Sequence, residues 1–269
     1  MSKVVVVTDS TAGIPQEVVD ELSILVAPQV LIWGQETYLD LVDIQPDEFY
    51  RRLQKASVMP STSQVTPTKF RDIFSQALEQ GYDILAVLIS EKLSGTIASA
   101  VQARDMLPKS PIEIVDSETT SMALGFHAIL AARAAQAGAS LAECKEIAEQ
   151  ARKHTGIYLT VDTLEFLHRG GRIGGGARFL SAALNIKPIL ELRNGRIEGL
   201  ERVRTRSKAL NRVAELVVEH VGDRQPVRLA SLHANAYQDA CNLLDQLNGR
   251  LGAIETMVSA VSPVIGTHA

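Results

Sequence analysis

Hydroxyl side chains gather at two places in this chain. Residues 61–64 read Ser-Thr-Ser-Gln, after Pro60 and before a predicted helix that begins at Pro67; residues 93–96 read Leu-Ser-Gly-Thr and open another predicted helix. A hydroxyl becomes a nucleophile only with a base within hydrogen-bond reach, and neither motif contains one. Hydroxyls and free N–H groups at a helix start suit an anion. We interpret Thr62, Ser63, Ser94 and Gly95 as a cradle for an anionic group, although an ordinary helix cap explains Ser94 equally well.

Three aspartates follow predicted strands. Asp9, Asp116 and Asp162 each come directly after or close behind an apolar run. Paired carboxylates at such positions can perform acid/base chemistry. Aspartate is also common there because its side chain caps loops and helices. Both interpretations stay open.

A glycine-rich segment carries two arginines. Residues 169–176 read Arg-Gly-Gly-Arg-Ile-Gly-Gly-Gly, which lacks the Gly-Lys-Ser/Thr ending of a Walker A loop and does not fit GxGxxG. The guanidinium groups of Arg169 and Arg172 suit a phosphate clamp or a docking surface.

No metal or cofactor motif is present. The six histidines are scattered without HxxxH or HExxH spacing, and Cys144 and Cys241 form no CxxC pair. We expect two buried thiols, no metal and no cofactor.

The first half of the chain supplies strands that would position these residues. Buried strands are predicted at 3–7, 82–89 and 112–115, with helices at 17–22, 97–106 and 120–136. This alternation is typical of a parallel α/β domain, whose ligands bind beyond the carboxyl ends of the strands. Residues 8–10, 90–96 and 116–121 should therefore line one crevice, with Asp9, Ser10 and Ser121 beside the hydroxyl cradle.

The second half predicts a different unit. Asn194-Gly195 between alternating apolar runs indicates a β-hairpin, and a strand at 157–161 precedes it. A helix at 207–220, a strand at 227–232, a helix at 236–248 and a strand at 254–259 follow. We expect an α/β protein with a parallel-sheet domain over residues 1–154 and an α+β domain over residues 155–269.

Composition and charge limit the classes of protein. Hydrophobic residues make up 46% of the 269 residues, which excludes a disordered or collagenous chain. No apolar run reaches the roughly 18 to 20 residues of a membrane span, and the first residues do not form a signal peptide, so we expect a cytoplasmic protein.

The charge is unevenly distributed along the chain. Lys+Arg minus Asp+Glu is 11 − 20 = −9 over residues 1–151, 13 − 5 = +8 over 152–212 and 3 − 6 = −3 over 213–269. The basic segment indicates a surface that meets phosphate or an acidic partner, or a solvated surface whose arginines pair internally.

Together these segments resemble the DegV family of bacterial fatty-acid-binding proteins, which includes the acyl-carrying subunits of fatty acid kinases. The matching segments occur in order along nearly the whole chain: residues 8–10 with 14–15, 38–40, 61–64, 93–96, 115–117 with 121–122, 162–165 through 174, 187–189 and 262–268.

The resemblance implies a two-domain fold that encloses a long-chain fatty acid in a tunnel between the domains. It implies that Thr62, Ser94, Gly95 and His268 bind the carboxylate, with Asp9, Ser10, Ser63 and Ser121 in support. It further implies that the chain is a carrier without catalytic residues, and that a separate ATP-dependent kinase subunit approaches Arg169 and Arg172. From the basic segment we add Arg202 to this docking surface, because it follows the predicted hairpin. The kinase subunit would form the acyl phosphate used in phospholipid synthesis.

Two other classes compete with the carrier. A small-molecule kinase or hydrolase could use Asp9, Ser94 and the glycine-rich loop on a phosphorylated substrate, and ATP binding by the isolated chain would reveal it. A nucleic-acid-binding regulator could use the basic segment, but the net charge is −4 and aromatic residues make up only 4% of the chain. We therefore expect neither nucleic acid nor membrane insertion.

Overall fold

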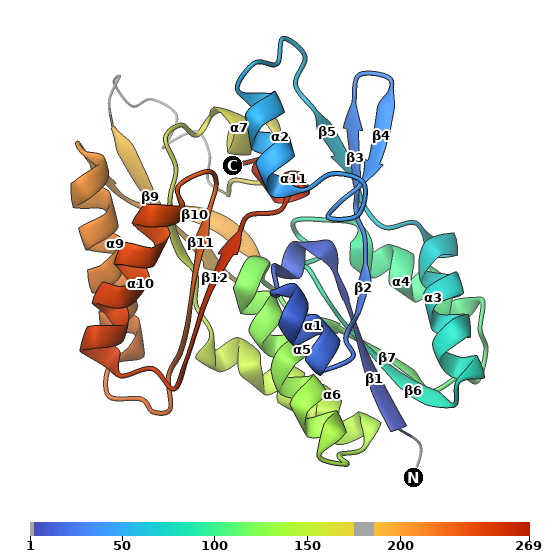
Figure 1. Ribbon diagram of the computed structural model, residues 1–269. Coiled ribbons are helices and arrows are strands. Elements are labelled where there is room, and N and C mark those ends of the chain that lie inside the picture. The colour runs from blue at the N-terminus through green and yellow to red at the C-terminus, as the bar shows by residue number, and fades with distance from the viewer. Residues whose placement is uncertain (1–2, 175–185) are drawn as a thin grey trace.

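A four-stranded parallel sheet forms the centre of the first half (Figure 1). The computed structural model describes residues 3–174 and 186–269. The strand order is β2-β1-β6-β7, formed by Leu25–Ala27, Lys3–Asp9, Tyr82–Leu88 and Ile112–Asp116. The three predicted parallel strands are thus confirmed, and β2 was not predicted. Strands β1 and β7 extend two residues and one residue beyond their predicted ends, and β6 ends one residue earlier.

Helices cover both faces of this sheet because successive strand residues point to opposite sides. Val6 and Leu85 face one layer, and Val5 and Ile84 face the other. The first layer contains α1 (Gln16–Glu21), α5 (Ser121–Gln136) and α6 (Leu141–Ala151), and the second contains α3 (Pro67–Glu79) and α4 (Thr96–Asp105).

A three-stranded antiparallel sheet was not predicted. Its order is β4-β3-β5, formed by Glu36–Leu39, Val30–Trp33 and Ser61–Ser63, and α2 (Pro46–Leu53) packs beside it. Residues 61–63, which the sequence places between Pro60 and a predicted helix with no strand signal, thus form a strand. Thr62 is paired with Leu31 in the sheet, and a run of three hydroxyl residues carries no apolar alternation that would indicate a strand.

The second half contains the predicted hairpin. Strands β8 (Tyr158–Thr160), β9 (Lys187–Arg193) and β10 (Arg196–Val203) form an antiparallel sheet in the order β10-β9-β8. Asn194 and Gly195 have φ angles of 49° and 77°, as the predicted turn requires. The predicted series continues with α9 (Arg206–Val221), β11 (Arg228–His233), α10 (Tyr237–Leu251) and β12 (Glu255–Ala260), in which β11 and β12 pair in parallel.

The last residues return to the first half of the molecule. After β12, the short helix α11 (Pro263–Gly266) packs on α2 and β3, and Val264 enters the apolar cluster of Trp33 and Phe49. The Tyr50 hydroxyl donates to the Val261 carbonyl at 3.0 Å. The C-terminus therefore lies beside α2 and α7 (Glu165–Arg169), as Figure 1 shows. The division after residue 154 stays a prediction.

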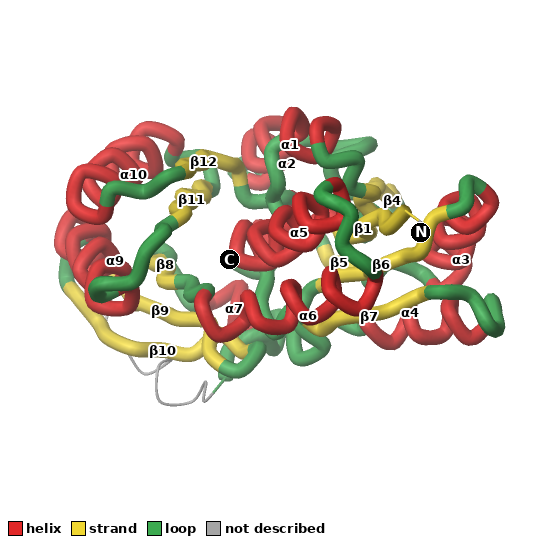
Figure 2. The backbone as a smooth tube through the Cα atoms, turned by 90° about the horizontal axis from the view of Figure 1, so that it is seen from below, coloured by secondary structure: helices red, strands yellow, loops and turns green. Residues whose placement is uncertain are grey.

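In the last turn of α5 a group of ion pairs joins the first half of the chain to the second. Arg133 on α5 binds both carboxylate oxygens of Glu255 at 2.6 and 2.8 Å, and Arg228 on β11 binds Glu255 at 3.0 Å. Figure 2 shows α5 between the central sheet and the second half. Among the helices of residues 3–174 and 186–269, none is long and apolar enough to cross a membrane.

Candidate functional site

The three strand-end loops lie together, as predicted. The Ile89 N–H donates to the Asp9 carboxylate at 2.8 Å, and the Ser90 N–H donates to the Thr119 carbonyl at 2.9 Å. The Glu91 N–H reaches the Asp116 carboxylate at 3.4 Å. These bonds hold the loops after β1, β6 and β7 at one edge of the sheet.

Asp9 is fully buried and saturated with donors. Besides Ile89, its carboxylate accepts from the Thr11 N–H at 3.0 Å, the Thr11 hydroxyl at 2.5 Å and the Gln29 amide at 3.1 Å. Burial raises the pKa of Asp9, and these donors oppose that rise. Asp9 therefore holds the loops in place, and its carboxylate is not turned toward a substrate.

Ser10 connects the first loop to the end of the chain through Asp40. The Ser10 hydroxyl donates to one oxygen of Asp40 at 2.6 Å, and the Val264 N–H donates to the other at 3.2 Å. Burial raises the pKa of Asp40 to about 6 despite these donors. The sequence indicates no role for Asp40, although residues 38–40 are among the segments that resemble the family.

Thr62 on β5 faces His268 at the end of the chain. The Thr62 hydroxyl and the His268 Nε2 lie 2.8 Å apart. Burial, and then the nearby positive charge of Arg172, lower the pKa of His268 to about 4. At neutral pH the imidazole is uncharged, so its Nε2 can donate to the threonine oxygen and leave the hydroxyl proton for an anion.

Gly170 and Arg172 pack against this pair. A Cβ at Gly170 would collide with the His268 Nδ1, so only glycine lets the histidine take this position. The Arg172 guanidinium donates to the Leu93 carbonyl at 3.2 Å and to the Gly170 carbonyl. Arg172 thus joins the loop after α7 to the loop that carries Ser94.

Ser94 and Gly95 lie at the start of α4. Gly95 is the N-cap residue, and the Ser94 hydroxyl lies 2.8 Å from the Thr96 hydroxyl, so Ser94 is not the cap. A Cβ on Gly95 would stand 3.3 Å from the Gln64 side chain, which places the Gly95 loop against β5. The two predicted hydroxyl motifs are therefore neighbours, and Ser63 is half-buried between Thr62 and Gln64.

A cavity of about 1340 Å³ lies close to this cluster, although Thr62, Ser94 and His268 are not among the residues that line it. Ile265 and Ala269, on either side of His268, line it, as do Phe166 and the predicted supporting residue Ser121. One face of α9 borders it with apolar residues three or four positions apart. These residues are Leu210, Val213, Val217 and Val221.

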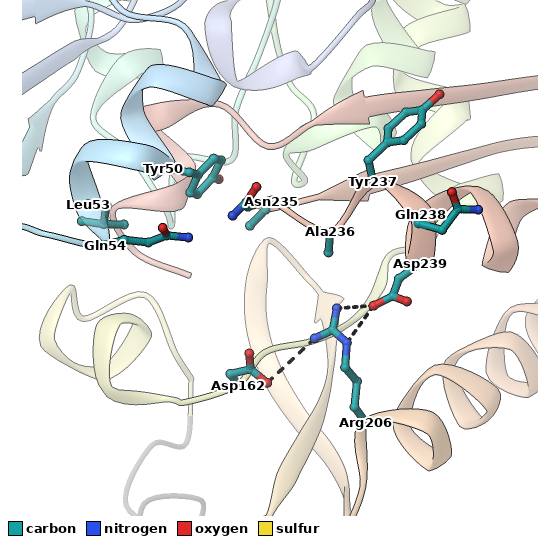
Figure 3. Close-up of a pocket in the computed structure, with 11 residues that line it drawn as sticks. Tyr50, Leu53, Gln54, Asp162, Arg206, Asn235, Ala236, Tyr237, Gln238 and Asp239 are labelled. Carbon is teal, nitrogen blue, oxygen red and sulfur yellow. Dashed lines mark hydrogen bonds and ion pairs between the residues drawn. The ribbon is translucent and has the colours of Figure 1, made fainter.

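A smaller pocket of about 650 Å³ adjoins the large cavity and shares part of its wall (Figure 3). In Figure 3, Arg206 extends between two carboxylates, and it binds Asp239 at 2.7 Å and approaches Asp162 at 3.9 Å. Tyr50 of α2 and Asn235 lie on the opposite wall. The charge of Arg206 is balanced, so among the described residues that line this pocket none is an unpaired cation.

The arginines proposed for partner docking have different surroundings. Arg169 is exposed and pairs with Glu165 one helical turn away at 2.6 Å. Arg202 is exposed on β10, whereas Arg172 is turned inward as described above. The predicted alternative of internal pairing holds elsewhere in the basic segment, where Arg193 binds Glu191 and Arg212 binds Glu201. Gly175 and Gly176 of the glycine-rich loop lie outside the described residues.

The aspartate and the cysteines that the sequence singled out lie outside the hydroxyl cluster. Asp162 binds Lys187 at 2.5 Å, Cys144 is buried, and Cys241 is partly buried as a free thiol. Within the described parts of the chain, no three His, Cys, Asp or Glu side chains are grouped to hold a metal ion.

Comparison with known proteins identifies the family. The family model described as "Uncharacterised protein, DegV family" matches residues 3–269. The chain is 34% identical over 268 residues to Protein DegV of Bacillus subtilis, covering 98% of this chain and 95% of that protein. The chain belongs to the DegV family. A DegV domain-containing protein of Streptomyces coelicolor is 38% identical over 267 residues, covering 98% of this chain and 94% of that protein.

Solved DegV structures share the whole fold. A crystal structure of DegV from Bacillus subtilis, described as a fatty acid binding protein, has a TM-score of 0.90 at 33% identity and covers 100% of this chain and 95% of that one. A DegV family protein from Thermus thermophilus, whose structure is described as showing fatty acid binding, has a TM-score of 0.88 at 32% identity, covering 99% and 95%. The predicted α/β fold of the DegV kind is confirmed.

Proposed function

We propose that this chain binds one long-chain fatty acid and presents its carboxylate to a separate ATP-dependent kinase subunit. The observation that carries the proposal is the large cavity, whose wall includes Ala269, the chain neighbour of the His268 that contacts Thr62. Fatty acid binding by the related DegV proteins supports it.

The cluster around Thr62 matches the chemistry of a carboxylate. A buried carboxylate without partners would cost several kcal/mol, which hydroxyl donors and a nearby cation offset. Thr62 and Ser94 supply hydroxyls, Gly95 lies at a helix start, and Arg172 is the positive charge close to His268. Arg172, first considered for docking, thus serves the headgroup in this proposal.

The cavity matches the chemistry of an acyl chain. Its walls carry Phe126, Leu130, Ile147 and Leu159, apolar side chains that are only partly covered by protein. Burying such surface contributes roughly 25 cal/mol per Å², so an acyl chain would be stabilised along its length.

Mass spectrometry after purification from a bacterial host tests the lipid part. Denaturation and organic extraction should release about one fatty acid per chain, and oleate added to stripped protein should raise the melting temperature, because a ligand of the native state stabilises it. If no acid is extracted and neither oleate nor palmitate binds, the chain is not a carrier.

Docking to a kinase subunit is tested at exposed arginines that lie outside the proposed carboxylate site. Arg169 directly precedes Gly170, which touches His268, so a kinase subunit that reaches the carboxylate would approach Arg169. Arg169→Gln and Arg202→Gln should slow acyl phosphate formation in a salt-sensitive way while fatty acid affinity stays intact. Arg71→Gln, at an exposed arginine of α3, is the matched control. Equal rates in all three variants would remove the docking role.

A further inference from the structure

The large cavity has a measurable length. The α9 face from Arg206 to Val221 borders it, and 15 residues of α-helix rise about 22 Å. All of β11 borders it as well, and the five steps from Arg228 to His233 extend about 17 Å. The lining stretches of these two elements therefore extend about 20 Å along the cavity.

The two ends of the cavity differ in character. The near end lies at Ile265 and Ala269, beside His268, and the Arg133–Glu255–Arg228 ion pairs mark the far end. Val221, Pro226 and Val227 line the far end with apolar side chains, and four polar, exposed side chains lie around them. These four are Glu143 and Glu146 of α6, and Arg224 and Gln225 in front of β11. Within the described residues, this polar rim is a place where the cavity meets solvent.

We propose that the far end is open, so that this chain accepts acids longer than the cavity and acids with a polar group at the tail end. The inference rests on the proposed fatty acid binding. A zigzag of C–C bonds of about 1.5 Å advances about 1.3 Å per carbon, so about 16 carbons span the cavity. Further methylenes emerge between α6 and Arg224 into water, where they neither gain burial nor meet a wall.

A series of saturated acids from 12 to 22 carbons tests the open end. The full chain is stripped of lipid, and each acid displaces a fluorescent fatty acid. Affinity should rise about fourfold per methylene up to about 16 carbons. For longer acids it should stay within about threefold of the value for the 16-carbon acid. A loss of more than tenfold beyond 18 carbons would show a closed end. If none of the acids binds, the proposed function fails instead.

A hydroxyl on the last carbon gives a second readout. At an open polar rim, 16-hydroxyhexadecanoic acid stays hydrated and should bind within about threefold of hexadecanoic acid. In a closed apolar end the buried hydroxyl would lose its water partners, and a loss of more than tenfold would overturn the proposal.

Variants of α6 locate the opening. Glu146→Trp places a large ring on the rim and should weaken the 20- and 22-carbon acids at least tenfold relative to the 12-carbon acid. Ala142→Trp, at an exposed position of the same helix that does not line the cavity, is the control and should leave the series unchanged. An unchanged series in Glu146→Trp would contradict an opening at this rim.

Discussion

The Thr62 hydroxyl and the His268 imidazole, 206 positions apart in the chain, lie 2.8 Å from each other. This contact joins a strand of the small antiparallel sheet to the returning end of the chain. Around it are the glycine that admits the imidazole and the arginine that reaches the Ser94 loop. The headgroup site we propose is therefore assembled from four distant segments.

Removing either hydroxyl should weaken fatty acid binding. Thr62→Ala or Ser94→Ala leaves a carboxylate oxygen short of a donor, which costs roughly 1 to 3 kcal/mol, or about 5- to 150-fold in Kd. Displacement of a fluorescent fatty acid measures the loss. Ser61→Ala, at an exposed hydroxyl of the same strand, is the control. Equal Kd values in Thr62→Ala and Ser61→Ala would refute the role of Thr62.

Gly170→Ala should displace His268. The new methyl would collide with the imidazole Nδ1, so His268 must move away from Thr62 and binding should weaken by about tenfold or more. Gly249→Ala, on α10 with open space around it, should leave binding unchanged and serves as the control. Wild-type affinity in Gly170→Ala would show that the position of His268 does not matter for the ligand.

Glu255→Gln should reduce stability by about 1 to 2 kcal/mol. The carboxylate loses its bidentate bond with Arg133 and its bond with Arg228, and both arginines remain partly buried. Because the arginines lower the pKa of Glu255, its contribution is present above the ordinary carboxyl pKa and is lost as pH falls through the lower folded value. Urea unfolding at pH 7 measures the loss, and Arg133→Gln in a double-mutant cycle assigns it to the pair. Additive effects would mean that the two residues do not act together.

His127 should make the protein acid-sensitive. The side chain is buried on α5, and burial lowers its pKa from 6.5 to about 4, so the unfolded chain takes up the proton first. As pH falls from about 6.5 to about 4, the free energy of unfolding therefore decreases by up to about 3 kcal/mol because of this side chain. The pH dependence that Asp40 contributes has the opposite sign. Its pKa is raised to about 6, so its contribution to the free energy of unfolding is lost as pH rises through that value.

The test of His127 thus compares variants at several pH values. The stability difference between wild type and His127→Gln, measured by urea unfolding, should shrink between pH 7 and pH 5. His154→Gln, at an exposed histidine, provides the control. A difference that is constant with pH would contradict a neutral buried His127.

The sequence predicted the parallel sheet and the hairpin because both have local signals. Buried strands such as β6 are continuous apolar runs, and Asn194-Gly195 supplies the two positive φ angles of the turn. Strand β5 was missed because its three hydroxyl residues have no apolar face of their own. It is held by hydrogen bonds to β3.

The candidate site was predicted by residue type but not by contact. Thr62 and Ser94 were identified from their hydroxyl motifs and His268 through the family resemblance, whereas the inward turn of Arg172 was not foreseen. Charge counting treats every arginine of the basic segment alike, but the Arg172 guanidinium is bound by the carbonyls of Leu93 and Gly170. Such contacts between distant segments leave no local pattern.

The return of the chain end to the first sheet also determines when the site can exist during synthesis. Residues 3–116 contain the parallel sheet and both hydroxyl motifs, yet His268 and Val264 can join them only after about 150 further residues have been made. On the ribosome, the emerging first half would fold around its sheet with the headgroup site incomplete. A fatty acid bound as we propose would therefore stabilise the chain only after His268 has joined the site, and it would not guide the earlier folding of the sheet.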